Sequence, residues 1–224
     1  MKFRVFALAA MTALAVSASA QVTYGNDYQY KPTGSTIYGS DNESFGLFYA
    51  QYNPSQVHVS SNGHSSNSSF NQVSLGYSHF IPLGDIPLFI SPGAAVQWAF
   101  SSDKQGSVEY KTNNIAVKIP VNLMYSFLVS DNFRIEPYAG IYGRINIWGE
   151  SKETYTTGGR EVTESYNLYS GDHANKRFAL GWNAGLNFRI TNAFTIGGGY
   201  YMDLTKIQDH TNWQGFDITL GINL

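Results

Sequence analysis

Eight segments of this chain alternate apolar residues with polar or small ones, and this period of two constrains the fold more than any other feature. The segments span residues 44–59, 69–80, 88–100, 114–129, 133–149, 176–190, 194–205 and 213–224. Successive side chains of a β-strand point to opposite faces of its sheet, so the alternation predicts strands with one apolar and one polar face. We therefore expect an all-β protein.

The alternation is clearest in the last segment, 213–224. There Phe216, Ile218, Leu220, Ile222 and Leu224 alternate with Asp217, Thr219, Gly221 and Asn223. The phase of segment 44–59 stays open, because apolar residues occupy both its odd and its even positions. They are Phe45, Leu47 and Tyr49 against Phe48, Ala50 and Tyr52.

Charged residues inside the segments share the polar phase. They are Lys118, Arg134, Glu136, Arg144, Arg177, Arg189, Asp203 and Asp217. If the apolar face meets lipid, these eight form a charge cluster in the lumen of a barrel. Alternation alone leaves the inverse arrangement open, a soluble sandwich or lipocalin-like barrel with an apolar interior.

Three features favour the membrane arrangement. The connections 81–87, 130–132 and 191–193 are short, whereas 60–68, 101–113, 150–175 and 206–212 are polar and mostly longer, which is typical of outer-membrane barrels. Aromatic residues predict a girdle at each membrane interface: Trp98, Trp148, Trp182 and Trp213 toward the long connections, and Phe80, Phe127, Phe133, Phe188 and Phe194 beside the short ones. Glycines on the polar phase fit a narrow lumen. They are Gly76, Gly93, Gly140, Gly181, Gly185, Gly197, Gly199 and Gly221.

The N-terminus predicts secretion. Lys2 and Arg4 precede an apolar run, and small residues close it at Ala20, so residues 1–20 form a signal-peptide pattern. Removing them changes the balance from 14 basic against 16 acidic residues to 12 against 16. This mildly acidic chain lacks a basic stripe, which argues against nucleic acid as a partner.

The chain contains no cysteine, which excludes disulfides and thiol chemistry. Residues 21–43 lack sustained alternation and predict an N-terminal periplasmic arm.

A family resemblance rests on the signal peptide and on strands rich in glycine and aromatic residues, such as 184–188 and 196–200 (AGLNF and IGGGY). Residues 44–224 resemble the small outer-membrane β-barrels of the OmpA and OmpX type, and most closely the outer membrane protein β-barrel domain or porin-family proteins of Bacteroidetes. The resemblance implies an eight-stranded antiparallel transmembrane β-barrel in the bacterial outer membrane. The lipid of that membrane would surround the barrel. It also implies recognition by the barrel-assembly machinery through the last strand, which usually ends in an aromatic residue and here ends in Leu224.

Three prolines conflict with regular strands. Pro92, Pro120 and Pro137 lie inside proposed strands and each removes a ladder donor, so we expect bulges or ladder breaks there.

The search for chemistry yields little. His58 and His64 lie six residues apart in a polar loop, too few for a metal site without further ligands. Ser78 and His79 invite comparison with outer-membrane lipid hydrolases, but neighbours on one strand point to opposite faces. We predict no catalytic, cofactor-binding or metal-binding residues.

The sequence predicts a non-enzymatic barrel that serves envelope integrity or surface interaction. Loop 150–175, with its charges and tyrosines, is the predicted site for an extracellular partner. The alternation around residues 162–169 also suggests that the strands extend outward here as a hairpin. The first alternative is a small diffusion pore for ions or small solutes, since five inner cations face three acids. A lipid-modifying enzyme and a soluble barrel with an apolar ligand are the others.

Overall fold

The computed structural model describes residues 43–61, 64–171, 174–205 and 211–224. The described residues all belong to one compact unit of the chain. The predicted signal peptide and all but the last residue of the predicted arm lie outside the described residues. The described part contains no helix long and apolar enough to cross a membrane.

The described residues form ten β-strands. These are β1 (Phe45–Ser61), β2 (His64–Pro82), β3 (Leu88–Gln105), β4 (Val108–Tyr125), β5 (Phe127–Ser130), β6 (Phe133–Thr157), β7 (Arg160–Asn167), β8 (Phe178–Ile190), β9 (Phe194–Asp203) and β10 (Thr211–Asn223).

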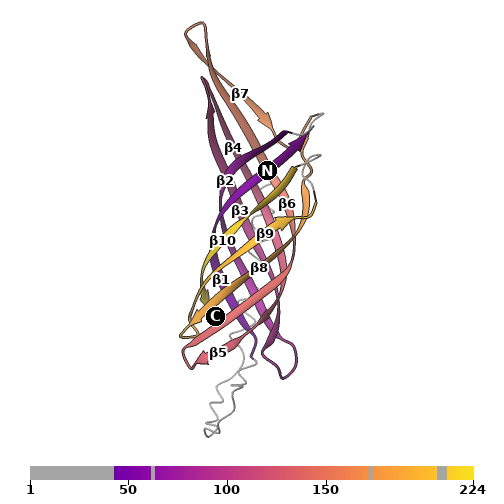
Figure 1. Ribbon diagram of the computed structural model, residues 1–224, viewed down its shortest axis with the longest axis vertical. Helices are drawn as coiled ribbons and strands as arrows, with labels where there is room; N and C mark the ends of the chain where they lie inside the picture. The colour runs from indigo at the N-terminus through magenta and orange to yellow at the C-terminus, as the bar shows by residue number, and fades with distance from the viewer. Residues whose placement is uncertain (1–42, 62–63, 172–173, 206–210) are drawn as a thin grey trace, which may run out of the picture. The chain divides into compact units, whose positions relative to one another are not determined.

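The strands close into an antiparallel barrel (Figure 1). The sheet order runs β4-β3-β2-β1-β10-β9-β8-β6, and β4 also pairs with β6, which closes the ring. Gly46 and Leu224 exchange backbone hydrogen bonds of 3.1 and 2.8 Å where β1 meets the end of the chain. Within the described chain the short β5 continues the path of β4 along β6, and β7 pairs with β6 beyond the ring. The structure thus confirms that the eight predicted strands form the wall of the barrel.

The two faces of the barrel are the ones that the charge phase predicts. Leu75, Ile141 and Phe216 are 62%, 57% and 64% exposed on the outside. Glu136 and Asp203 are 2% and 0% exposed inside. In a soluble barrel the apolar side chains would be inside, so the inverse arrangement is wrong. The open phase of segment 44–59 resolves in the same way, with Leu47 and Tyr49 buried.

The prolines lie at ladder gaps, as predicted. The β2–β3 pairing is interrupted between Ser78↔Gly93 and Ile81↔Ile90, and Pro92 falls in that gap. The β3–β4 pairing is interrupted between residues 92 and 95 of β3, and Pro120 of β4 falls in that gap. Pro137 keeps its place opposite β8 but faces the interruption between β4 and β5 at Ser126. Each missing N–H therefore falls where a neighbouring strand offers no regular acceptor.

The two ends of the barrel differ in their connections (Figure 1). At the short-turn end lie the turns between β2 and β3, β5 and β6, and β8 and β9, together with the C-terminal residue. At the opposite, long-hairpin end the sequences predicted as loops 60–68, 101–113 and 150–175 are largely strand, which corrects the sequence reading. Paired backbone persists there although both faces are largely polar, so alternation gave a signal only around residues 162–169. The predicted hairpin around residues 162–169 is confirmed by β7.

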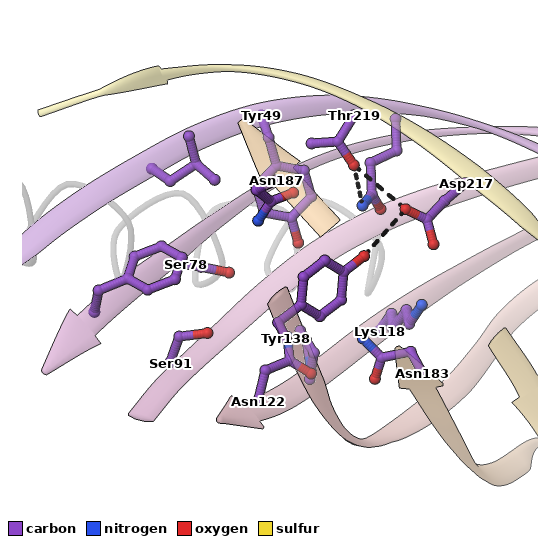
Figure 2. Close-up of a pocket in the computed structure, with 14 residues that line it drawn as sticks. Tyr49, Ser78, Ser91, Lys118, Asn122, Tyr138, Asn183, Asn187, Asp217 and Thr219 are labelled. Carbon is purple, nitrogen blue, oxygen red and sulfur yellow. Dashed lines mark hydrogen bonds between the residues drawn. The ribbon is translucent and has the colours of Figure 1, made fainter. Parts of the chain in front are cut away.

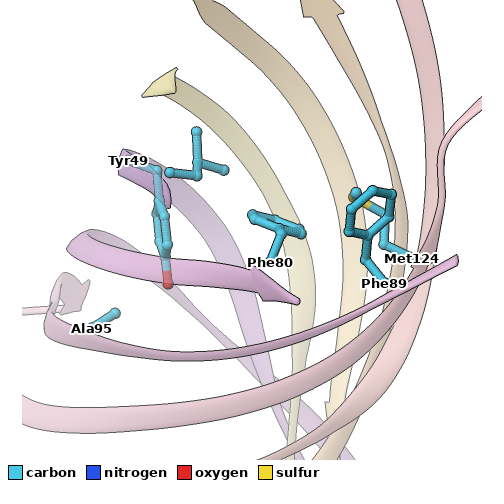
Figure 3. Packing of buried hydrophobic residues seen from close by; sticks show 6 residues of the cluster. Tyr49, Phe80, Phe89, Ala95 and Met124 are labelled. Atoms are coloured by element: carbon cyan, nitrogen blue, oxygen red, sulfur yellow. The ribbon is translucent and has the colours of Figure 1, made fainter. Parts of the chain in front are cut away.

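Two apolar clusters pack inside the barrel. Figure 3 shows the first, in which Leu47, Tyr49, Phe80, Phe89, Ala95 and Met124 lie together. Phe80 is 4% exposed, so its assignment to the aromatic girdle was wrong. The second cluster contains Ala99, Tyr142, Tyr201 and Trp213. Buried charged side chains contact both clusters.

Candidate functional site

The structure buries seven of the eight charged side chains that the sequence assigned to the lumen. Lys118, Arg134, Glu136, Arg144, Arg189, Asp203 and Asp217 are each at most 8% exposed. Arg177 is exposed and precedes the first residue of β8. Its guanidinium donates a hydrogen bond of 2.9 Å to the Ile147 carbonyl and lies 5.0 Å from the ring of Tyr169. Arg177 therefore lies at the long-hairpin end and does not join the buried cluster.

One ion pair joins β6 to β9. Arg144 forms a salt bridge with Asp203 through its Nη2 and the carboxylate Oδ2. The hydroxyl of Tyr142 donates a 2.6 Å hydrogen bond to the other oxygen of that carboxylate. The Arg144 guanidinium also lies 4.7 Å from the ring of Trp213. Both charges are almost fully buried and directly compensated, which is the condition under which buried ions persist.

A second ion pair lies toward the short-turn end. Arg189 of β8 pairs with Glu136 of β6, and Ser126 donates a 3.1 Å hydrogen bond to the same carboxylate. The Arg189 guanidinium also lies 3.7 Å from the ring of Phe45. Ser126, at the interruption between β4 and β5, thus helps to satisfy the buried acid.

Lys118 and Asp217 line a small polar cavity in the barrel interior (Figure 2). Tyr138 and Thr219 each donate a 3.4 Å hydrogen bond to Asp217. The Lys118 ammonium lies 4.2 Å from the ring of Tyr142, a cation–π contact. The cavity measures about 50 Å³. A volume of this size holds a few water molecules and is far below that of a continuous aqueous channel.

Lumen tyrosines are functional side chains that sequence reasoning missed. Tyr138 and Tyr142 donate to the buried carboxylates, and glycines of β8 make room for both rings. A Cβ added at Gly181 would lie 2.3 Å from Cζ of Tyr142, and one at Gly185 would lie 2.5 Å from the Tyr138 hydroxyl. The signal was present, since both tyrosines share the phase of Glu136 and Arg144.

The predicted tryptophan girdle is partly wrong. Trp98 and Trp148 point outward, 48% and 38% exposed, and Trp182 is half-buried beside Tyr200 with 5.7 Å between ring centroids. Trp213 is only 7% exposed and packs inside against Phe70. Trp213 shares the phase of Asp217, and this phase was the signal for a lumen position that the girdle assignment overlooked.

A polar sheet rises from the long-hairpin end. It consists of the outer parts of β3, β4 and β6 together with β7, and pairing continues from Glu150↔Asn167 to Thr157↔Arg160. Tyr110 shares the phase of the lumen residue Asn114, and it pairs with Glu153, which pairs with Glu164. We call the side of this sheet that carries these side chains the mouth-side face.

Tyr169 packs inside the barrel below this sheet. It is 9% exposed, and its hydroxyl donates a 2.8 Å hydrogen bond to Asn114, which in turn donates one of 3.0 Å to Asn146. Gly149 permits this packing, since a Cβ there would lie 2.6 Å from the Tyr169 ring.

The remaining candidate chemistry does not assemble. Ser78 is buried at 5% exposure, whereas His79 lies on the other face, 3.3 Å from the Tyr77 hydroxyl. The side chains of His58 and His64 lie outside the described ones. Among described residues no group of three or more His, Asp or Glu side chains is placed to hold a metal ion.

A closed antiparallel ring with an apolar exterior and a polar, packed interior defines a transmembrane β-barrel. The chain belongs to the outer membrane protein beta-barrel domain family, whose model matches residues 20–209. The protein is accordingly a β-barrel of the bacterial outer membrane, embedded in its lipid bilayer.

Solved structures with a similar fold are distant in sequence. Ail, the attachment invasion locus protein of Yersinia pestis, crystallised with the heparin analogue sucrose octasulfate, is 13% identical with a TM-score of 0.43, over 80% of this chain and 99% of that one. Neisserial surface protein A is 16% identical with a TM-score of 0.37, over 79% and 96%. The N-terminal barrel of Pseudomonas aeruginosa OprF is 10% identical with a TM-score of 0.31, over 80% and 99%. The search of curated proteins gave no match.

Proposed function

We propose that this protein is a non-enzymatic barrel that makes contacts at the cell surface through its long hairpins. The observation that carries the proposal is the polar sheet at the long-hairpin end. Strand β6 runs 25 residues, to Thr157, and β7 returns beside it with nearly every side chain exposed. A connection that only joined two barrel strands would not need a hairpin of this length, as the short turns at the other end show.

The filled lumen supports this function over transport. The ion pairs Arg144–Asp203 and Arg189–Glu136 cross the interior, and Tyr169 packs inside it at the long-hairpin end. Eight-stranded barrels are just wide enough for side chains to fill them. A diffusion pore is therefore the weaker candidate.

The remaining parts of the proposal concern export and assembly. Residues 1–20 act as the signal peptide and residues 21–43 as a periplasmic arm. The barrel-assembly machinery receives β10, whose apolar phase ends at the exposed Leu224. Both ends of the barrel domain then face the periplasm, and the long hairpins face outward.

The test compares a strain lacking the protein with strains that carry either the full chain or a chain trimmed between Lys152 and Ser165. The residues removed belong to the polar sheet that extends the β6–β7 hairpin, and the β4–β6 pairing from Lys111↔Lys152 to Met124↔Tyr138 is retained, so the trimmed barrel should fold, which heat-modifiable migration on a gel will verify. We expect it to restore resistance to detergent but not adherence between cells and surfaces. Full restoration of adherence by the trimmed chain would leave only a role in envelope integrity.

A further inference from the structure

Strand β7 has an edge that pairs with no other strand of the described chain. It pairs with β6 in unbroken register through all eight of its residues. In Figure 1 the β6–β7 hairpin rises above the other labelled strands. Along the second edge, about every second residue directs its N–H and C=O groups away from β6. Such an edge is a template for another extended chain.

The edge carries no proline and no bulge, which are common devices against unwanted pairing. Instead it carries three charged residues, Arg160, Glu161 and Glu164. Charges restrict which chain can pair, because a like charge placed opposite is unfavourable and an opposite charge is favourable. The side chains therefore define the partner.

Glu164 ends a row of side chains on the mouth-side face. Asp103 pairs with Tyr110, Tyr110 with Glu153, and Glu153 with Glu164, so three of the four are acidic. Glu164 accepts a 3.0 Å hydrogen bond from the Tyr155 hydroxyl and another from Tyr166. These bonds, that of Tyr166 first, lower the pKa of Glu164 below its ordinary value, so the edge presents an oriented carboxylate.

The opposite face of the same sheet is electrostatically balanced. There Lys111 pairs with Glu109 at 2.9 Å and Lys152 with Glu150 at 3.5 Å, and Lys104 and Glu161 add one charge of each sign. On the mouth-side face Arg160 offsets only one of the three acids, so the net negative charge lies there. On β7 itself Glu164 is flanked on that face by Val162 and by Tyr166, which is 50% exposed.

We propose that the free edge of β7 binds an extended segment of another polypeptide as an added strand. That segment places a basic side chain opposite Glu164 and apolar side chains two residues away on either side, opposite Val162 and Tyr166. This inference names the partner class of the proposed surface function and rests on it. The main-chain hydrogen bonds supply affinity, and alternate side chains supply selectivity.

The first test uses the full protein in lipid nanodiscs and a fluorescent peptide, Ser-Val-Thr-Lys-Thr-Val-Ser. Two further peptides carry N-methyl groups on one or the other set of alternate residues. An added strand directs only one set of its N–H groups toward β7, so one methylated peptide should lose at least tenfold in affinity while the other keeps its binding. Equal binding by all three peptides, or no binding by the unmodified one, overturns the proposal.

The second test uses paired variants of β7. Glu164→Gln should weaken binding of the lysine peptide about two- to fivefold, as expected for an exposed ion pair. Glu161→Gln removes the same charge from the opposite face and should leave the affinity unchanged. Equal losses of peptide affinity in both variants would show that the peptide is attracted by charge in general. They would refute the assignment of its lysine to the mouth-side face.

Failure here is distinguishable from failure of the proposed function. If the trimmed hairpin abolishes adherence while no peptide binds, the surface role stands and the added strand is refuted.

Discussion

At the scale of single residues, the barrel depends on satisfying charges that its narrow interior encloses. Arg189, Glu136 and Ser126 illustrate how this is done, since the acid receives an ion pair and a hydroxyl hydrogen bond. An apolar lumen of equal volume would avoid the desolvation of these ions. The polar lumen instead follows from the apolar exterior, because alternation leaves only one phase for polar side chains.

The Glu136–Arg189 pair gives a prediction at this scale. Glu136→Ala should lower the free energy of unfolding by about 3–5 kcal/mol, because it leaves the Arg189 charge buried without its partner. Folding titrations in lipid vesicles will measure this. Glu161→Ala, at an exposed position of β7, is the control and should change stability by less than about 0.5 kcal/mol. Similar small effects of both substitutions would show that water already solvates the lumen acid.

At the scale of elements, strands continue for different distances beyond the two rims of the barrel. At the short-turn end, positive φ angles at Thr191 and Asn192 let the chain reverse within a few residues between β8 and β9. At the other end, the β6–β7 hairpin turns at Gly158 and Gly159, both with positive φ. The asymmetry predicts which end faces outward.

Cysteine labelling tests this orientation without background, since the chain has no cysteine of its own. Thr157 and Asn132 are exposed positions at the two ends and avoid the left-handed residues of the turns. An impermeant thiol reagent on intact cells should label Thr157→Cys and leave Asn132→Cys unlabelled until the membrane is opened. The reverse pattern would show that the long hairpins face the periplasm.

At the scale of the whole molecule, side chains pack the barrel interior. One apolar cluster contains Phe80 and another contains Tyr201. Buried charges contact both, since the Arg189 guanidinium lies 3.7 Å from the ring of Phe45 beside the first cluster and the Lys118 ammonium lies 4.9 Å from the ring of Tyr201. This packing is the reason to expect a barrel that spans the membrane without conducting solutes.

Planar bilayer recording tests the sealed lumen. Wild-type protein should show negligible conductance, because side chains occupy the interior of a barrel of this size. Tyr169→Ala removes only one packed side chain at one end, so it should remain closed as well. A steady conductance of the wild-type barrel would instead promote the diffusion pore to the leading function.

Sequence by itself determined the strands, their faces and the membrane class, because period-two alternation is a local property that each strand carries alone. Where both faces are polar, as in 101–113 and 150–161, alternation has little contrast, and only pairing with neighbouring strands reveals the sheet. Which ions meet was likewise decided by the tertiary structure. Arg144 and Asp203 lie 59 residues apart in the chain, and their contact depends on barrel closure and strand register. Trp213 shows the boundary between the two kinds of information, since its phase was readable but its burial against Arg144 and Phe70 required the closed barrel.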